Sequence, residues 1–262
     1  MDRARMTTAP VARADGSSLR WGVPAALLLT GAVGWWWSVR MAADMAAENP
    51  AMAGMTMGQM LSFSGFVLAW LAMMAAMMLP AITPVLRLYA LAAAHGRVAP
   101  LPFFVAAYLV VWTLPAIPAY SAWRWLETPL LQGAPWAARL AGGVLVVAAV
   151  WQLTPLKAAC LRHCRSPLSF FMQYGSGAAR PLGAFRMGAA HGLFCLGCCW
   201  AMMAVLVALG TMNLAWMLAL SVLIFLEKNA PGGARIAVLG AVVFALAGMA
   251  LLFDPGLLTH LD

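Results

Sequence analysis

One apolar segment of this chain, HGLFCLGCCWAMM at residues 191–203, carries a series of side chains that can bind soft metals. They are His191, Cys195, Cys198, Cys199, Met202 and Met203. Residues three and four apart share a face of an α-helix, so this spacing places imidazole, thiol and thioether groups along one stripe. These groups are ligands for soft metals, and contact with lipid alone does not explain their presence in a membrane helix. The alternative is that each Cys packs as a small apolar residue.

Two further groups of sulfur-containing residues could contribute to the same site. The first is LAMMAAMMLP, whose spacing places four thioethers on one broad helical face: Met73, Met74, Met77 and Met78. The second is CLRHC, in which Cys160 and Cys164 lie four residues apart and form a candidate pair for metal entry or exit. Methionine can also be mere core filler, and the Cys pair could be reduced thiols in a basic loop.

The elements that must position these residues are membrane helices. The chain of 262 residues is 64% hydrophobic and 9% charged, whereas soluble domains are about 25% charged. This composition predicts a polytopic, all-α transmembrane bundle without a separate soluble domain. The net charge of +8 comes from residues in loops between apolar segments, so membrane topology explains it and no nucleic-acid partner is expected.

Apolar segments of the length that a bilayer requires predict about seven spans. We expect them near residues 21–39, 61–84, 102–124, 136–156, 184–209, 213–228 and 234–253. They form a single helical domain over residues 21–254, between a disordered cytoplasmic tail at 1–20 and a short outer tail at 255–262. Pro80 and Pro84 should distort or end the second span, and Pro115 and Pro118 should kink the third.

Basic residues orient the predicted bundle, because cytoplasmic loops are enriched in Lys and Arg. With the N-terminus inside, only Arg40, Arg124 and Arg139 of the 16 Lys and Arg residues fall outside, which predicts an N-inside, C-outside topology. The Met-rich segment 40–60 then lies outside, where it could collect Cu(I), although a flexible or membrane-surface segment is the alternative. The basic loop 157–186 lies inside. His191 and the Met73–Met78 group share the cytoplasmic half.

Ionisable side chains near the end of the sixth predicted span have two interpretations. Glu227 and Lys228 could be interfacial, with Lys228 extending towards the headgroups. Glu227 could instead be a hard ligand, a proton acceptor or a hydrogen-bond partner of His191. Gln152, near the cytoplasmic end of the fourth span, is a further polar group within the membrane.

The segments MMAAMMLP, CLRHCRSPLSFF and HGLFCLGCCWAMM, followed by FLEKNAP, resemble a bacterial family of predicted metal-binding integral membrane proteins. The resemblance spans roughly residues 60–230 and implies a multi-pass helical protein of the bacterial inner membrane with a metal site. No reaction comes with it. Carried over by motif, the implied metal residues are Met73, Met74, Met77, Met78, Cys160, Cys164, His191, Cys195, Cys198 and Cys199.

The ligand types favour Cu(I) over Zn(II), because thioether groups rarely bind zinc. We therefore expect a protein that moves or delivers copper within the lipid bilayer, with a metallochaperone or another membrane protein as its partner. A transmembrane thiol–disulfide carrier using Cys195 and Cys198 is an alternative, as is a scaffold without metal. A copper-dependent oxidase is disfavoured by the scarcity of His, and no catalytic motif of a known hydrolase or nucleotide-binding enzyme is present.

Overall fold

The computed structural model describes residues 62–132, 134–209 and 214–260, together with Gly22, Ala25, Leu29, 31–36 and Arg40. All regular elements in this part of the chain are helices. They are α3 (Phe63–Ala81), α4 (Thr83–Ala94), α5 (Leu101–Thr113), α6 (Ala116–Leu131), α7 (Pro135–Gln152), α8 (Pro155–Arg165), α9 (Pro167–Tyr174), α10 (Pro181–Ala208), α11 (Leu214–Asn229), α12 (Gly233–Phe253) and the short 3-10 helix η1 (Pro255–His260). The N-terminal tail, most of the span predicted at 21–39 and, apart from Arg40, the Met-rich segment 40–60 lie outside the described residues.

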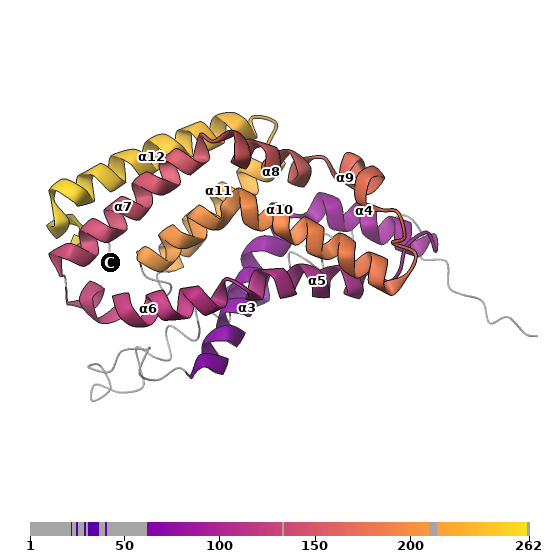
Figure 1. Ribbon diagram of the computed structural model, residues 1–262, viewed down its shortest axis with the longest axis horizontal. Coiled ribbons are helices and arrows are strands. Elements are labelled where there is room, and N and C mark those ends of the chain that lie inside the picture. The colour runs from indigo at the N-terminus through magenta and orange to yellow at the C-terminus, as the bar shows by residue number, and fades with distance from the viewer. Residues whose placement is uncertain are drawn as a thin grey trace, which may run out of the picture.

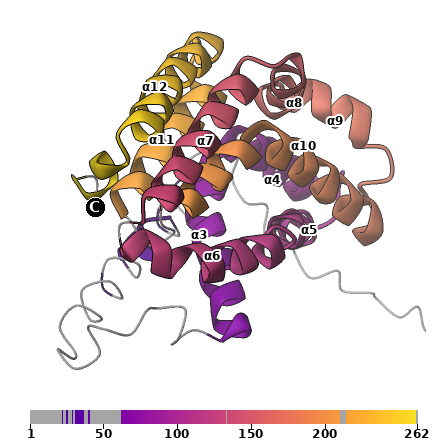
Figure 2. The same ribbon diagram turned by 60° about the vertical axis from the view of Figure 1, so that its left-hand side comes forward.

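Helix α10 is the longest helix of this part of the chain, and it packs against α5, α7 and α8. Figure 1 shows α12 and α7 side by side along one edge of the molecule and α10 beside α5 at the other end. Figure 2 shows the same bundle after a rotation. Close approach of α5 and α10 depends on Gly188, because a Cβ atom there would collide with the backbone of Phe104. This packing brings the sulfur-bearing face of α10 into the interior.

Prolines interrupt the second and third predicted spans where the sequence indicates. Helix α3 ends at Ala81, directly after Pro80, and α4 begins at Thr83 with Pro84 in its first turn. Helix α5 ends at Thr113 and α6 begins at Ala116, on either side of Pro115. Proline lacks a backbone N–H and clashes with the preceding turn, so the helices stop or bend there.

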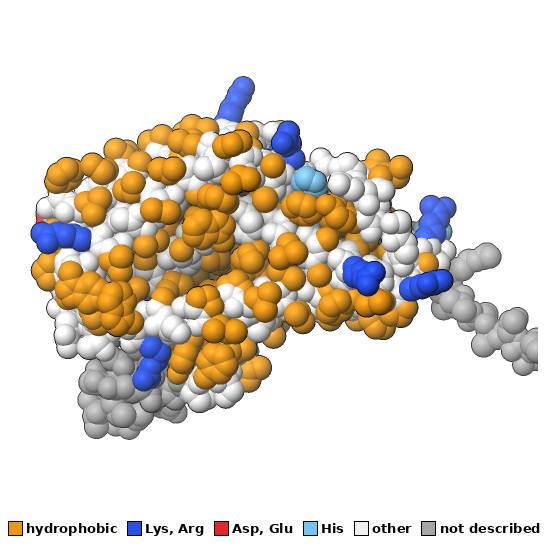
Figure 3. Space-filling model, in the orientation of Figure 1, with side chains coloured by type: hydrophobic (Ala, Val, Ile, Leu, Met, Phe, Trp, Pro, Cys, Tyr) orange, Lys and Arg blue, Asp and Glu red, His pale blue; other side chains and the backbone are white. Residues whose placement is uncertain are grey.

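Four stretches of the described chain are long and apolar enough to cross a membrane: Phe63–Ala81, Leu101–Leu126, Pro181–Ala208 and Gly233–Phe253. Helices α7 and α8 make a fifth if they count together as one bent span. The face in Figure 3 is mostly apolar, with Lys and Arg at its margins. A groove of about 800 Å³ with apolar walls lies on α6, α7 and α10. The all-α membrane bundle is therefore supported, whereas seven spans and their orientation stay predictions.

Residues 157–186, which we expected as a loop, contain two helices. Thr154 caps α8 by accepting a hydrogen bond from Lys157 N, and Pro155 occupies its first turn, so a new helix begins here at 67° to α7. Lys157, Leu161 and Cys164 recur at helical spacing and form the buried face of α8. The loop prediction is wrong: it was based on the basic residues of this segment, whereas the spacing of the buried residues is helical.

Candidate metal centre

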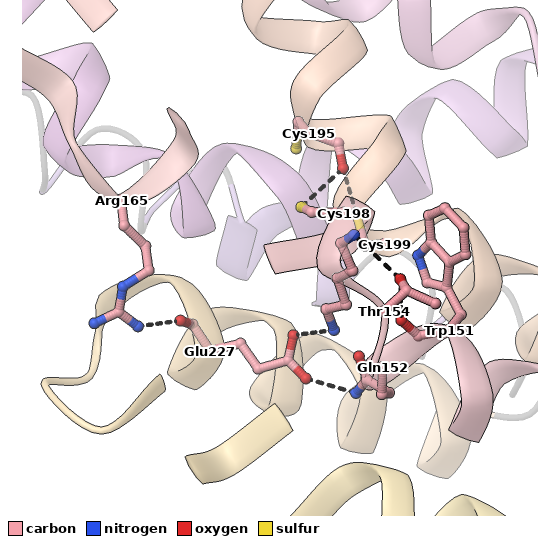
Figure 4. A network of polar contacts seen from close by, with 9 residues as sticks. Trp151, Gln152, Thr154, Arg165, Cys195, Cys198, Cys199 and Glu227 are labelled. Atoms are coloured by element: carbon pink, nitrogen blue, oxygen red, sulfur yellow. Dashed lines mark hydrogen bonds and ion pairs between the residues drawn. The ribbon is translucent and has the colours of Figure 1, made fainter. Parts of the chain in front are cut away.

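The stripe on α10 faces the core. His191, Cys195, Cys198 and Cys199 are all at most 1% exposed, and Met202 and Met203 are also buried. The thiols of Cys198 and Cys199 donate to the carbonyl oxygen of Cys195 at 3.1 and 2.8 Å. Figure 4 shows Cys195 one turn away from Cys198 and Cys199 on this helix. The sequence prediction of a shared helical face is therefore confirmed in its geometry.

A thiol from a second helix joins this stripe. Cys164, on α8, is buried in the same core as Cys195 and Cys198, close enough for their thiols to interact electrostatically. Helix α8 reaches this position because the chain bends by 67° after α7 and α8 packs along α10. Three sulfur atoms from two helices therefore gather in one apolar interior.

The sulfur of Cys195 lies at the meeting point of four helices. Lys228 Nζ, from α11, donates to Cys195 Sγ at 2.8 Å, and Tyr108 Oη, from α5, shares a hydrogen bond with the same sulfur at 2.9 Å. Both side chains are buried. Sequence reasoning missed Tyr108 and treated Lys228 as interfacial, and the structure corrects this because the ammonium group points inward to sulfur. The signal available in the sequence was a lysine directly after an apolar span.

Cys160 lies at the outer end of the cluster of cysteine thiols. It is half-buried, and its sulfur lies against α10 where Gly197 leaves room, since a Cβ atom at Gly197 would come within 2.9 Å of it. His163, between the two cysteines of α8, instead stacks on Phe194 with ring centroids 4.1 Å apart. The pair predicted in CLRHC therefore spans from the half-buried edge of the site to its interior.

His191 is fully buried, yet neither of its ring nitrogens has a hydrogen-bond partner among the described residues. The rings of Phe104, Tyr108 and Phe170 surround it at centroid distances of 4.9 to 6.0 Å. Leaving a buried polar group unpaired costs about 1–3 kcal/mol, so native structures seldom do so without a ligand or a function. Its place one turn before Cys195 makes the imidazole a candidate ligand.

This observation predicts the effect of removing the imidazole. Replacement of His191 by Leu should raise the free energy of unfolding of the metal-free protein by about 1–2 kcal/mol, because an unsatisfied polar group is replaced by an apolar one of similar size. Denaturation of metal-free protein in detergent measures the change. His163→Leu is the control. The ring of His163 has a hydrogen-bond partner in the carbonyl oxygen of Ala159, so its replacement should not stabilise the protein. Destabilisation by His191→Leu would contradict the prediction.

Glu227 does not contact His191, so that interpretation of Glu227 is wrong. Its carboxylate accepts hydrogen bonds from Lys157 Nζ at 2.6 Å and Gln152 Nε2 at 2.7 Å, and the ion pair is almost fully buried. Figure 4 shows the Glu227 carboxylate directed at Gln152. Arg165 caps the end of α11 by donating to the carbonyl oxygens of Glu227 and Ala230. Both ends of α8 are thus attached to α11.

The four methionines predicted in α3 are all buried in the same core as the thiols. Helix α3 packs against α5 and α11, the helices that supply Tyr108 and Lys228. A further link is the hydrogen bond from Asn229 Nδ2 to the carbonyl oxygen of Ala81. Met73, Met74, Met77 and Met78 therefore lie on a helix next to those that surround Cys195, and their role as ligands stays a prediction.

The donor groups define which metals fit. Among the described residues, no three His, Cys, Asp or Glu side chains have an arrangement that could hold a metal ion together. A structural zinc site, which needs four such ligands, is therefore not preformed here. Paired thiols beside an unpaired imidazole, in a core rich in thioethers, suit a soft monovalent ion such as Cu(I), which requires fewer ligands.

Comparison with known proteins agrees with this chemistry. Residues 67–251 match the model of a protein family described as PpoB2, copper chaperone. The match includes both thiol-bearing helices, the four methionines of α3 and Lys228. No curated protein and no solved structure matches the chain.

Proposed function

Because the chain belongs to the PpoB2 copper chaperone family, we propose that it handles copper within a membrane by binding Cu(I) through thiolate sulfur between α8 and α10. The observation that carries the proposal is that α8 packs along α10 and buries Cys164 in the same core as Cys195 and Cys198. A cysteine ligand binds metal as the thiolate, so each thiol that becomes a ligand releases a proton.

Cys195 is the central ligand of the proposed site. Its sulfur already contacts an ammonium group and a phenol, and Cys164 and Cys198 lie in the same core. The ring nitrogens of His191 have no other partner, so His191 would be a further ligand once metal binding draws these side chains together, since three of them are not prearranged as a site. Met77 or Met78 of α3 would supply a thioether. Cu(I) prefers this mixture of soft ligands, whereas Zn(II) would favour four thiolate or imidazole ligands.

Cys160 would be the ligand through which copper enters or leaves. It is the most exposed of the cysteines, and it lies one turn of α8 before the buried Cys164. Transfer between sulfur ligands along this helix would let the ion move without being released into an apolar environment. A soluble metallochaperone or another membrane protein would exchange copper at this end.

The proposed location is the inner membrane of a bacterium. Four stretches are long and apolar enough to span a bilayer, and the distribution of Lys and Arg favours a cytoplasmic N-terminus. In that orientation Cys160 and His191 face the cytoplasmic side. The segment 40–60, with its six methionines, would collect Cu(I) on the opposite side, where thioether groups bind it without deprotonation.

Copper content of the purified protein tests this proposal. Protein purified in detergent under anaerobic, reducing conditions should bind Cu(I), and Cys195→Ser should lose most of it. Ala201→Ser is the matched control, because it adds the same hydroxyl group to a buried position of the same helix and removes no sulfur. Equal copper content in the parent protein and Cys195→Ser would overturn the proposal.

The proximity of Cys164 to Cys195 and Cys198 also favours a second candidate, a thiol–disulfide carrier. Two thiols would form a disulfide, and their two electrons and two protons would pass to a partner disulfide. A Cys164–Cys195 or Cys164–Cys198 disulfide that forms in oxidised glutathione, with no Cu(I) bound by the reduced protein, would favour this function. Binding of Cu(I) by thiols that resist oxidation would favour the copper function.

A further inference from the structure

Lys228 is a buried cation without a carboxylate partner. It is 5% exposed, and its ammonium group donates to Cys195 Sγ at 2.8 Å. The buried carboxylate of Glu227 is paired with Lys157 and not with Lys228. Isolated charges in apolar interiors are costly and are found almost always in pairs. The ammonium group contacts sulfur instead, and sulfur becomes an anion when it binds a metal as the thiolate.

Among the groups around Lys228, only the cysteine sulfurs are available as an anionic partner for its ammonium group. On α11, the neighbouring Glu227 is occupied by Lys157 and Gln152, and these charges cancel. Arg165, from α8, binds backbone carbonyl groups and adds no negative charge. From α5, Tyr108 bonds to the same sulfur as Lys228. Lys228 interacts electrostatically with His191 and Tyr108 and with four thiols that can become anionic, those of Cys164, Cys195, Cys198 and Cys199.

We infer that the fixed positive charge of Lys228 makes the thiol site selective for a monovalent metal ion. This inference rests on the proposed copper function and assigns the residue that determines its specificity. The thiols of Cys198 and Cys199 keep their protons, which they donate to the carbonyl oxygen of Cys195, so Cys164 and Cys195 are the two thiols that would bind the metal as thiolates. These two thiolates and one Cu(I) form a complex with a single negative charge, which the ammonium group of Lys228 neutralises. Two thiolates and a divalent ion form a neutral complex, and the buried ammonium group then has no counter-charge.

The low polarity of the interior makes this difference large. Removing one member of a buried charge pair leaves the other uncompensated, and this is far more costly than at a surface. A neutral residue at position 228 should therefore disfavour the Cu(I) complex, which would keep an unbalanced negative charge. It should leave a neutral complex with a divalent ion unaffected or stabilise it. Tyr108 can donate a hydrogen bond to the sulfur in either case and does not discriminate between the ions.

Paired metal titrations test the assignment. The parent protein, Lys228→Met and Lys228→Arg are titrated anaerobically in detergent with Cu(I) against bicinchoninic acid, and separately with Zn(II) against a zinc-binding indicator. Lys228→Met should lower the affinity for Cu(I) by about tenfold or more, with the affinity for Zn(II) unchanged or higher. Lys228→Arg keeps the charge and should keep the ratio of the two affinities close to that of the parent protein.

The outcomes separate this inference from the proposed function. A parent protein that binds no Cu(I) overturns both. A parent protein that binds Cu(I), with the same ratio of affinities in Lys228→Met, overturns the role of Lys228 alone. Equal loss of both metals would indicate a merely structural role and would also overturn it. Lys228→Gln, which is neutral but polar, carries the same expectation if Lys228→Met fails to fold.

Discussion

Replacement of Glu227 by Gln is expected to lower the free energy of unfolding by about 3–5 kcal/mol, because it leaves the ammonium group of Lys157 buried without a counter-charge. The exposed fractions of the two side chains are only 1% and 2%, so water cannot replace the lost carboxylate. Unfolding of metal-free protein in detergent by heat or denaturant measures the effect.

The double variant Lys157→Met/Glu227→Gln is the control for this prediction. It removes both charges, so it should recover most of the stability that the single variant loses. A loss below about 1 kcal/mol in Glu227→Gln would be typical of an exposed ion pair and would show that the Lys157–Glu227 pair is solvated.

The same ion pair should influence the thiol site. Lys157 and Arg165 attach the two ends of α8 to α11, and Cys164 lies between them on the buried face of α8. Loosening α8 would move Cys164 away from Cys195 and Cys198. The buried ion pair is therefore both a stabilising contact and the means by which a short helix holds its sulfur in place.

Replacement of Cys164 by Ser is expected to weaken Cu(I) binding by at least about 100-fold. Loss of an outer-shell partner alone costs 10- to 100-fold at metal sites, and Cys164 is proposed as a direct ligand. Competition against a Cu(I) chelator measures the affinity. Cys160→Ser is the matched control, because it removes the same atom from the same helix at the half-buried edge of the site.

The two cysteine variants should change different properties of the site, one the affinity for Cu(I) and the other the rate of copper transfer. Cys160→Ser should keep nearly the equilibrium affinity of the parent protein and slow the transfer of copper to an external chelator. Equal losses of affinity in Cys160→Ser and Cys164→Ser would mean that the buried position of Cys164 has no special importance, contrary to the proposed site.

Much of the local structure could be predicted from the sequence. Apolar segments identified α3, α5, α7, α10, α11 and α12, and prolines marked where α3 and α5 end. The spacing of His191, Cys195, Cys198 and Cys199 predicted their common face. These features depend on residues close together in the chain, whose geometry within one helix is known in advance.

The contacts between helices could not be predicted in the same way. Cys195 meets Lys228 and Tyr108 across 33 and 87 residues of sequence, and such pairs depend on how the helices pack. Glu227 had several suitable partners in the sequence, and only the turn between α7 and α8 brings Lys157 to it. The buried face of α8 was detectable in the spacing of Lys157, Leu161 and Cys164, but the basic residues around it suggested a loop.

The central claim is that Cu(I) binds to sulfur from both α8 and α10. X-ray absorption at the copper K-edge, recorded on Cu(I)-loaded protein and on Cys164→Ser, tests it most directly. The proposed site predicts a ligand shell dominated by sulfur in the parent protein and fewer sulfur ligands in the variant. A shell of nitrogen and oxygen, or a spectrum that Cys164→Ser leaves unchanged, would contradict it.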